Sequence, residues 1–150
     1  MSQKEKTEEI YSFEKKYADN RMVLREHIPL NIPLCISFEA SDLCNFKCVM
    51  CHHGNPEYNM YSHANQNMKK ELFQKCINEL IEWKKKTEKK VKVIKLYSLG
   101  EPLINPNIVD MVRIVKEADI CDTLEITSNA SLLTEDVGKG LVDYGLDIFR

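Results

Sequence analysis

Residues 35–51, CISFEASDLCNFKCVMC, place three cysteines directly after a short stretch typical of a β-strand. The strand is expected over 35–40, and the chain then enters a loop that lasts until about residue 67. A connection of that length inside a compact fold is usually functional or disordered. Cys44, Cys48 and Cys51 follow a C-x3-C-x2-C spacing, which lets one loop turn three sulfurs toward one centre.

Strands and helices are expected to alternate along the rest of the chain. We predict a helix over 68–86, a strand over 91–97, a helix opening at Asn105-Pro106, a strand over 123–127, a helix over 134–145 and the start of a strand over 146–150. Asn105 is the expected N-cap and Pro106 the first helical residue. This order predicts βαβ units, and hence an α/β fold with a parallel sheet.

The segment before the first strand differs in character, and we treat residues 1–34 and 35–150 as separate regions. Residues 1 to about 20 are rich in Lys and Glu, with apolar side chains at helical steps, and predict a short amphipathic helix. Pro29 and Pro33 then favour an extended connector into residue 35.

Composition narrows the class of protein. The 150 residues are 43% hydrophobic and 29% charged, as in ordinary globular proteins. A net charge of -2 gives no reason to expect nucleic-acid binding. No apolar run is long enough to span a bilayer or to form the core of a signal peptide, so no membrane partner is expected and the cytoplasm is the default compartment. In a reducing compartment, six cysteines favour metal binding or free thiols over disulfides.

Three interpretations of the cysteine triplet remain open from the residues alone. An iron–sulfur cubane held at three corners would keep one iron available to an external ligand. A closed zinc site would need a fourth ligand, which His52, His53 or His63 could supply. In the third interpretation the thiols are buried without a metal, as is expected of the cysteines outside the triplet, Cys35, Cys76 and Cys121.

Two further motifs follow the next two predicted strands. Leu99-Gly100-Glu101-Pro102 comes after the strand at 91–97, and Thr127-Ser128-Asn129-Ala130 ends the strand at 123–127. Ligands in α/β folds bind at the carboxyl ends of strands, although Gly, Pro, Ser and Asn are also ordinary turn residues.

Together the motifs resemble the radical S-adenosylmethionine (SAM) superfamily. Cys44, Cys48 and Cys51 match its C-x3-C-x2-C signature, and Gly100-Glu101-Pro102 matches its GGEP motif with Leu99 in place of the first glycine. The resemblance spans roughly residues 35–150. It implies the N-terminal half of a partial (β/α)6 barrel with parallel strands, and a 4Fe-4S cluster held by the three cysteines.

The resemblance also implies residues that bind SAM. The backbone of Met50, at a position that is often aromatic in the family, would contact the adenine. The backbone of Gly100 and the carboxylate of Glu101 would engage the α-amino group. Ser128 and Asn129 would contact the ribose or the carboxylate of SAM, with Ala130 standing where glycine is usual.

In that family the reduced cluster cleaves SAM to a 5'-deoxyadenosyl radical that abstracts a hydrogen from the substrate. The resemblance therefore implies an oxidoreductase-like enzyme, an electron donor such as flavodoxin or ferredoxin, and a peptide, protein or sugar-like substrate. The approach to the first strand and the Cys-Val-Met-Cys ending look SPASM-like. The alternatives are a non-catalytic zinc or iron–sulfur module, or a split chain that needs a partner.

Overall fold

A computed structural model of the chain describes residues 24–26, 28–54 and 66–150. The chain divides into two units, Met1–Leu30 and Asn31–Arg150. The described part of the first unit contains a 3-10 helix, η1 (Leu24–Glu26). The amphipathic helix predicted for residues 1 to 20 lies outside the described residues.

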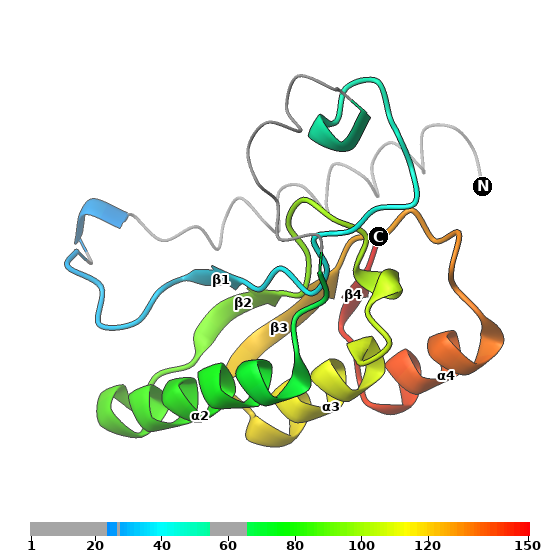
Figure 1. Cartoon of the computed structure of the whole chain (residues 1–150). Coiled ribbons are helices and arrows are strands. Elements are labelled where there is room, and N and C mark those ends of the chain that lie inside the picture. The colour runs from blue at the N-terminus through cyan, green and yellow to red at the C-terminus, as the bar shows by residue number, and fades with distance from the viewer. Residues whose placement is uncertain (1–23, 27, 55–65) are drawn as a thin grey trace, which may run out of the picture. The chain divides into compact units, whose positions relative to one another are not determined.

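The second unit is built on a four-stranded parallel sheet. The strands run in the order β1 (Cys35–Ser37), β2 (Val91–Lys95), β3 (Cys121–Ile126) and β4 (Ile148–Phe149), each paired with its neighbour in sequence (Figure 1). The predicted α/β class and parallel sheet are confirmed. The first strand is shorter than predicted, because the chain past Ser37 already bends toward the loop that carries the cysteines.

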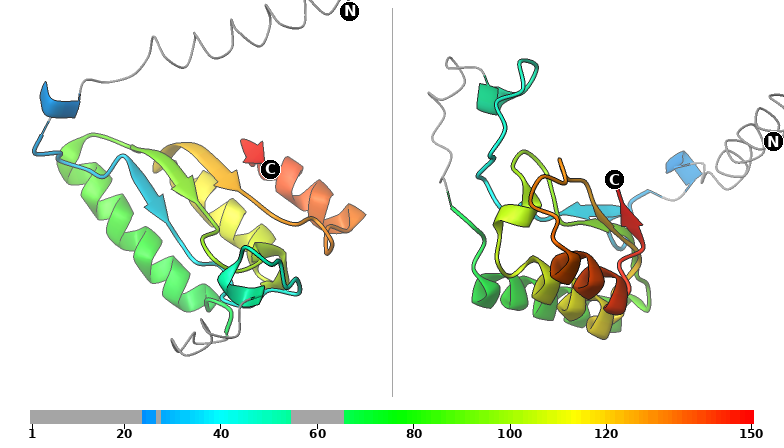
Figure 2. Two further views of the ribbon diagram at one scale, coloured as in Figure 1. Left: turned by 90° about the horizontal axis from the view of Figure 1, so that it is seen from above. Right: turned by 90° about the vertical axis from the view of Figure 1, so that its right-hand side faces the viewer.

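One helix follows each of the first three strands. These are α2 (Lys70–Thr87), α3 (Ile108–Ala118) and α4 (Glu135–Asp143). All three lie on the same face of the sheet, so the unit has one layer of strands and one of helices (Figure 2). No helix in the described part of the chain is both long and apolar enough to cross a membrane.

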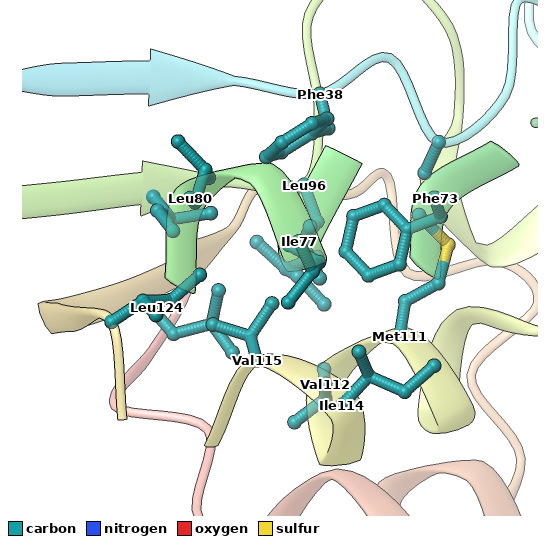
Figure 3. Packing of buried hydrophobic residues seen from close by; sticks show 14 of the residues in the cluster. Phe38, Phe73, Ile77, Leu80, Leu96, Met111, Val112, Ile114, Val115 and Leu124 are labelled. Carbon is teal, nitrogen blue, oxygen red and sulfur yellow. The ribbon is translucent and has the colours of Figure 1, made fainter. Parts of the chain in front are cut away.

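Apolar side chains from both layers meet in a single buried core between the sheet and the helices (Figure 3). Phe73, Ile77 and Leu80 come from α2, at the three- and four-residue steps of a helix face. Phe38, which follows β1, packs edge-on against Phe73 with ring centroids 5.1 Å apart. Ile94 of β2 belongs to the same core, together with Leu96, Met111, Val112, Val115, Leu124 and Ile126.

Three side chains that the sequence assigned to the interior lie at the surface. For the helix over 68–86 the sequence predicts a buried apolar stripe that includes Leu72 and Trp83, but these two side chains are 53% and 40% exposed. They lie beside the buried side chains of Phe73, Ile77 and Leu80 on α2, but on a part of the helix surface that faces solvent. Cys35 is also exposed, because it faces away from the helices.

The predicted start of the second helix was wrong. The helix α3 begins at Ile108 and is preceded by Asn107, whereas Asn105 is fully buried. The Asn105 amide nitrogen donates to the carbonyls of Ala40, at 2.6 Å, and Met68, at 3.0 Å. Its Oδ1 accepts from the Asn107 amide at 2.9 Å, which forms a local turn, while its amide nitrogen binds the ends of another loop, and the helix begins only at Ile108.

Candidate functional site

All the predicted site residues lie in loops that leave the carboxyl ends of strands (Figure 1). The loop from residue 41 to 67, called the cysteine loop below, follows β1. Gly100 and Glu101 follow β2, and Ser128 and Asn129 follow β3. Because parallel strands share one carboxyl edge, motifs far apart in the sequence meet at the place where α/β folds bind ligands.

The two ends of the cysteine loop are joined at its base. Ser41 and Asn67 form an antiparallel bridge, and the Met68 amide donates to the Ala40 carbonyl at 3.0 Å. The side-chain amide of the buried Asn105 donates to the carbonyls of both Ala40 and Met68. The loop is therefore anchored to the sheet by a residue that lies about 40 positions further along the chain.

The three cysteines have free thiols, and Cys48 is the most exposed of them. The Phe46 amide donates to Cys44 Sγ at 3.4 Å, and Cys51 Sγ lies 3.6 Å from His52 Nδ1. Among the described residues, no three His, Cys, Asp or Glu side chains are grouped so as to hold a metal ion. The three sulfurs therefore do not converge on one centre in this structure.

The donor set nevertheless fits an iron–sulfur cluster in its chemistry and chain spacing. Three reduced cysteines lie within eight residues of one loop, and cluster iron is normally held by cysteine sulfur. The turn is tight, because a Cβ added to Gly54 would lie 2.1 Å from the Cys48 carbonyl oxygen. The Cys51 amide also donates to that carbonyl at 3.0 Å. Binding a cluster would require the side chains to be gathered, while the backbone turn is already formed.

Gly100 permits a close approach between the loops after β1 and β2. A Cβ at this position would lie 2.0 Å from the Ser41 carbonyl oxygen and 2.8 Å from that of Leu43. The neighbouring Glu101 amide donates to the Leu43 carbonyl at 2.7 Å. Only glycine leaves room for this contact, which fixes the start of the cysteine loop against the Gly-Glu-Pro turn.

The Glu101 carboxylate joins the ends of β2 and β3. It is only 3% exposed. Its Oε1 accepts from the Ser128 hydroxyl at 2.7 Å and the Leu103 amide at 2.9 Å, and Oε2 accepts from the Asn129 amide at 2.8 Å. The Leu103 contact also caps a 3-10 helix, η4 (Pro102–Ile104). Three donors offset the cost of burying the charge.

The Ser128-Asn129 segment also contacts the cysteine loop directly. Asn129 Nδ2 donates to Asn45 Oδ1 at 3.0 Å, and Asn45 Nδ2 donates to Ser131 Oγ at 2.7 Å. Ala130 has a φ of 59°, in the left-handed region that glycine adopts more readily than alanine. Its amide donates to Ser128 Oγ at 2.9 Å, which holds this conformation. The three motifs thus form one connected network.

Glu39 is a site residue that the sequence analysis missed. Its carboxylate accepts from the Leu99 amide at 2.8 Å and the Gly100 amide at 3.1 Å. The carboxylate therefore shapes the turn after β2, just as Glu101 shapes the turn after β3. The sequence did contain a signal for this role, because Glu39 is an acidic residue between the end of β1 and the cysteine loop. Met50, by contrast, is 87% exposed on the cysteine loop.

The fold has known relatives among solved structures. No protein-family model matches the sequence. The structure is similar to that of BtrN in complex with AdoMet and 2-DOIA, with a TM-score of 0.61 and 22% identity over 79% of this chain and 44% of BtrN. It is also similar to BtrN in an open conformation, with a TM-score of 0.58 and 23% identity over 79% of this chain and 49% of that one. These likenesses show a BtrN-like α/β fold.

A curated relative is the tungsten-containing aldehyde ferredoxin oxidoreductase cofactor-modifying protein of Pyrococcus furiosus. The two sequences are 29% identical over 110 residues, which is 73% of this chain and 28% of the relative. The chain thus spans less than a third of this relative and less than half of BtrN.

Proposed function

We propose that this chain forms the N-terminal part of a radical SAM enzyme and binds a 4Fe-4S cluster and SAM at the carboxyl edge of its sheet. The fold would then be the first half of a partial (β/α)6 barrel. The observation that carries the proposal is the hydrogen-bonded network that joins the cysteine loop, the Gly-Glu-Pro turn and the Ser128-Asn129 segment. The proposal is also supported by the similarity of this fold to that of BtrN, which was solved in complex with AdoMet.

Each part of the network has a role in this proposal. Cys44, Cys48 and Cys51 would hold the cluster through their thiolates. The Glu101 carboxylate has about four acceptor positions, and donors in the described part of the chain use three of them, which leaves one for the α-ammonium group of SAM. The Ser128 hydroxyl donates to Glu101 and accepts from the Ala130 amide, so it would accept from a ribose hydroxyl of SAM, and a contact with the carboxylate of SAM would require it to release Glu101.

A cluster held by Cys44, Cys48 and Cys51 would supply the single electron needed for reductive cleavage of SAM and so for radical chemistry on a substrate. The residues of this chain bind and orient. The Glu39 carboxylate keeps the turn after β2 in position through the Leu99 and Gly100 amides, and the Glu101 carboxylate does the same for the turn after β3 through the Asn129 amide. An electron donor such as flavodoxin or ferredoxin would approach the exposed side of the cysteine loop.

A zinc site is the second candidate, because the imidazole of His52 lies 3.6 Å from the Cys51 sulfur. Three thiolates and one imidazole would make a closed tetrahedral site. Such a site has no open position for SAM, so the two candidates differ in a measurable response.

The test is anaerobic reconstitution of the full chain with iron and sulfide. We expect about four irons and four sulfides per chain, and a reduced electron paramagnetic resonance signal that changes when SAM is added. Cys48→Ala should lose the cluster, whereas Cys35→Ala should keep it, because Cys35 is an exposed cysteine outside the loop. Stoichiometric zinc without a response to SAM would refute the proposal, as would equal cluster loss in both variants.

A further inference from the structure

The face of the sheet opposite the helices carries a row of polar side chains. In the described part of the chain, helices cover only one face (Figure 2). Ser37, Lys95 and Glu125 are register partners on neighbouring strands, so they lie side by side and point to the same face, opposite the described helices. Tyr97 follows Lys95 by two residues and lies on this face as well.

Such a face is unusual for a parallel sheet. Parallel strands are generally covered on both sides and are then apolar on both sides. Here the two faces of β2 differ, because Ile94 and Leu96 are buried under the helices while Lys95 and Tyr97 are partly exposed. A polar face of this kind suits a polar ligand better than an apolar protein layer.

Glu125 forms the centre of a charged cluster on that face. Its carboxylate is only 4% exposed. Its Oε1 accepts from the Tyr97 hydroxyl at 2.5 Å and from the Arg150 guanidinium at 2.5 Å. The positive charge of Arg150 thus balances the negative charge of the Glu125 carboxylate, and the Tyr97 hydroxyl donates a further hydrogen bond to it.

Lys95 adds a second cation to the same cluster. Its ammonium lies 5.5 Å from the centroid of the Tyr97 ring, and no described carboxylate forms an ion pair with it. The Tyr97 hydroxyl raises the pKa of the Lys95 ammonium above its usual value, and Cys35 and Glu125 act in the same direction. Lys95 therefore stays protonated at neutral pH, and the cluster has more positive than negative charge.

The cluster adjoins the proposed SAM site. The Arg150 carbonyl accepts from the Ser128 amide at 2.9 Å, and Tyr97 precedes Leu99 of the Gly-Glu-Pro turn by two residues. A molecule on this face near Lys95 would lie next to the residues proposed to bind SAM.

We infer that Lys95 binds an anionic group of the substrate, a carboxylate or a phosphate, on the face of the sheet opposite the described helices. Tyr97, Glu125 and Arg150 are positioning residues, since their mutual hydrogen bonds fix the wall beside the ammonium. The inference rests on the proposed function, because it takes the molecule bound beside the SAM site to be the substrate.

Nuclear magnetic resonance titration of the full, metal-free chain tests this inference. Sodium phosphate and sodium acetate serve as probes, at an ionic strength held constant with sodium chloride. We expect saturable shifts of backbone amides in residues 93–97 and 123–127. A charge-assisted contact implies that Lys95→Gln weakens binding about ten- to a hundredfold. Saturation by phosphate alone identifies a phosphate group, and saturation by acetate alone identifies a carboxylate.

Two further variants control the experiment. Lys95→Arg keeps the charge and should bind within about threefold of the parent, which also excludes a general loss of structure. Lys92→Gln removes an exposed lysine of the same strand that pairs with Asp122, and should leave the affinity unchanged. The inference is overturned if neither anion gives saturable shifts on this face, or if Lys95→Gln and Lys92→Gln have equal effects.

The outcome is separable from that of the proposed function. Anion binding is measured without iron or SAM, whereas cluster binding is measured without an anion. A chain that binds the cluster but no anion would refute only the role of Lys95. A chain that binds phosphate or acetate at Lys95 but neither iron nor SAM would refute the enzyme proposal and show an anion site in another kind of protein.

Discussion

The helix-covered face of the sheet and the loops at its carboxyl edge are stabilised by different interactions. Under the helices, side chains such as Phe73, Ile77 and Leu124 are in apolar contact and excluded from water (Figure 3). At the carboxyl edge, Glu39 and Glu101 accept hydrogen bonds from backbone amides of other loops. The first arrangement depends on shape and area, and the second on the position of single donors.

This difference has a consequence for mutation. Apolar burial is spread over many contacts, so its effect scales with the volume that is removed. A buried polar contact depends on one atom, and removing that atom leaves a donor without a partner. Variants in the two regions should therefore differ in how strongly they change stability.

The largest effect is expected in the apolar region. Phe73→Ala should lower the free energy of unfolding by about 3–5 kcal/mol, because it removes a fully buried ring and its contact with Phe38. Urea unfolding followed by circular dichroism measures the change. Leu72→Ala on the same helix is the control and should cost less than about 1 kcal/mol, because Leu72 is exposed. Equal losses would show that the described core is wrong.

Two glycines should respond with opposite signs. Gly100→Ala should destabilise the chain by about 1–3 kcal/mol, because its Cβ would overlap the Ser41 carbonyl oxygen. Gly138→Ala, in the interior of α4, should stabilise it by about 0.5–1 kcal/mol, because the nearest atom to the new Cβ is a Leu133 methyl at 3.8 Å. Thermal unfolding of both variants measures the difference. A neutral Gly100→Ala would mean that the two loops do not touch.

Removing the charge of Glu101 tests the polar region. Glu101→Gln should cost about 1–3 kcal/mol in urea unfolding, since an amide nitrogen would face the Ser128 hydroxyl or the Asn129 amide. The Asn129 amide resonance should shift as its acceptor changes. Glu79→Gln on the exposed face of α2 should stay within about 0.5 kcal/mol. An unchanged Asn129 resonance would contradict the network.

A polar contact in the helix layer should contribute least. Lys70 Nζ lies 2.5 Å from Asp110 Oδ2, and its hydrogen bond, with a further contribution from Arg113, lowers the pKa of the Asp110 carboxyl. A lowered pKa in the folded state stabilises the chain above the unfolded value of about 3.9, and this contribution is lost as the pH falls through the folded value.

Because both side chains are more than a third exposed, the contribution should be about 0.2–1 kcal/mol at neutral pH. Asp110→Asn should therefore reduce stability slightly at pH 7, and the variant and parent should converge near pH 2. Asp143→Asn, at the exposed end of α4, is the control for general charge effects. A loss that persists at pH 2 would point to packing and not to charge.

Much of the fold could be predicted because its signals are local. The alternation of apolar stretches identified each strand and helix, and the predicted helix start at residue 134 agrees with α4, whose N-cap Thr134 accepts from the Val137 amide. The start of α3 was mispredicted, because Asn105 has the local features of a cap but is bound by distant carbonyls. Local patterns do not show which remote group will satisfy a polar side chain.

The sequence by itself determined which residues follow each strand, and so which motifs share the carboxyl edge. Tertiary structure alone decided how these motifs are joined: Glu39 to the turn at Gly100, Glu101 to Ser128 and Asn129, and Glu125 to Arg150. The physical reason is the distance along the chain over which each kind of interaction acts. Periodicity and spacing act over a few residues, whereas a buried carboxylate is satisfied by any donor that the folded chain brings within about 3 Å.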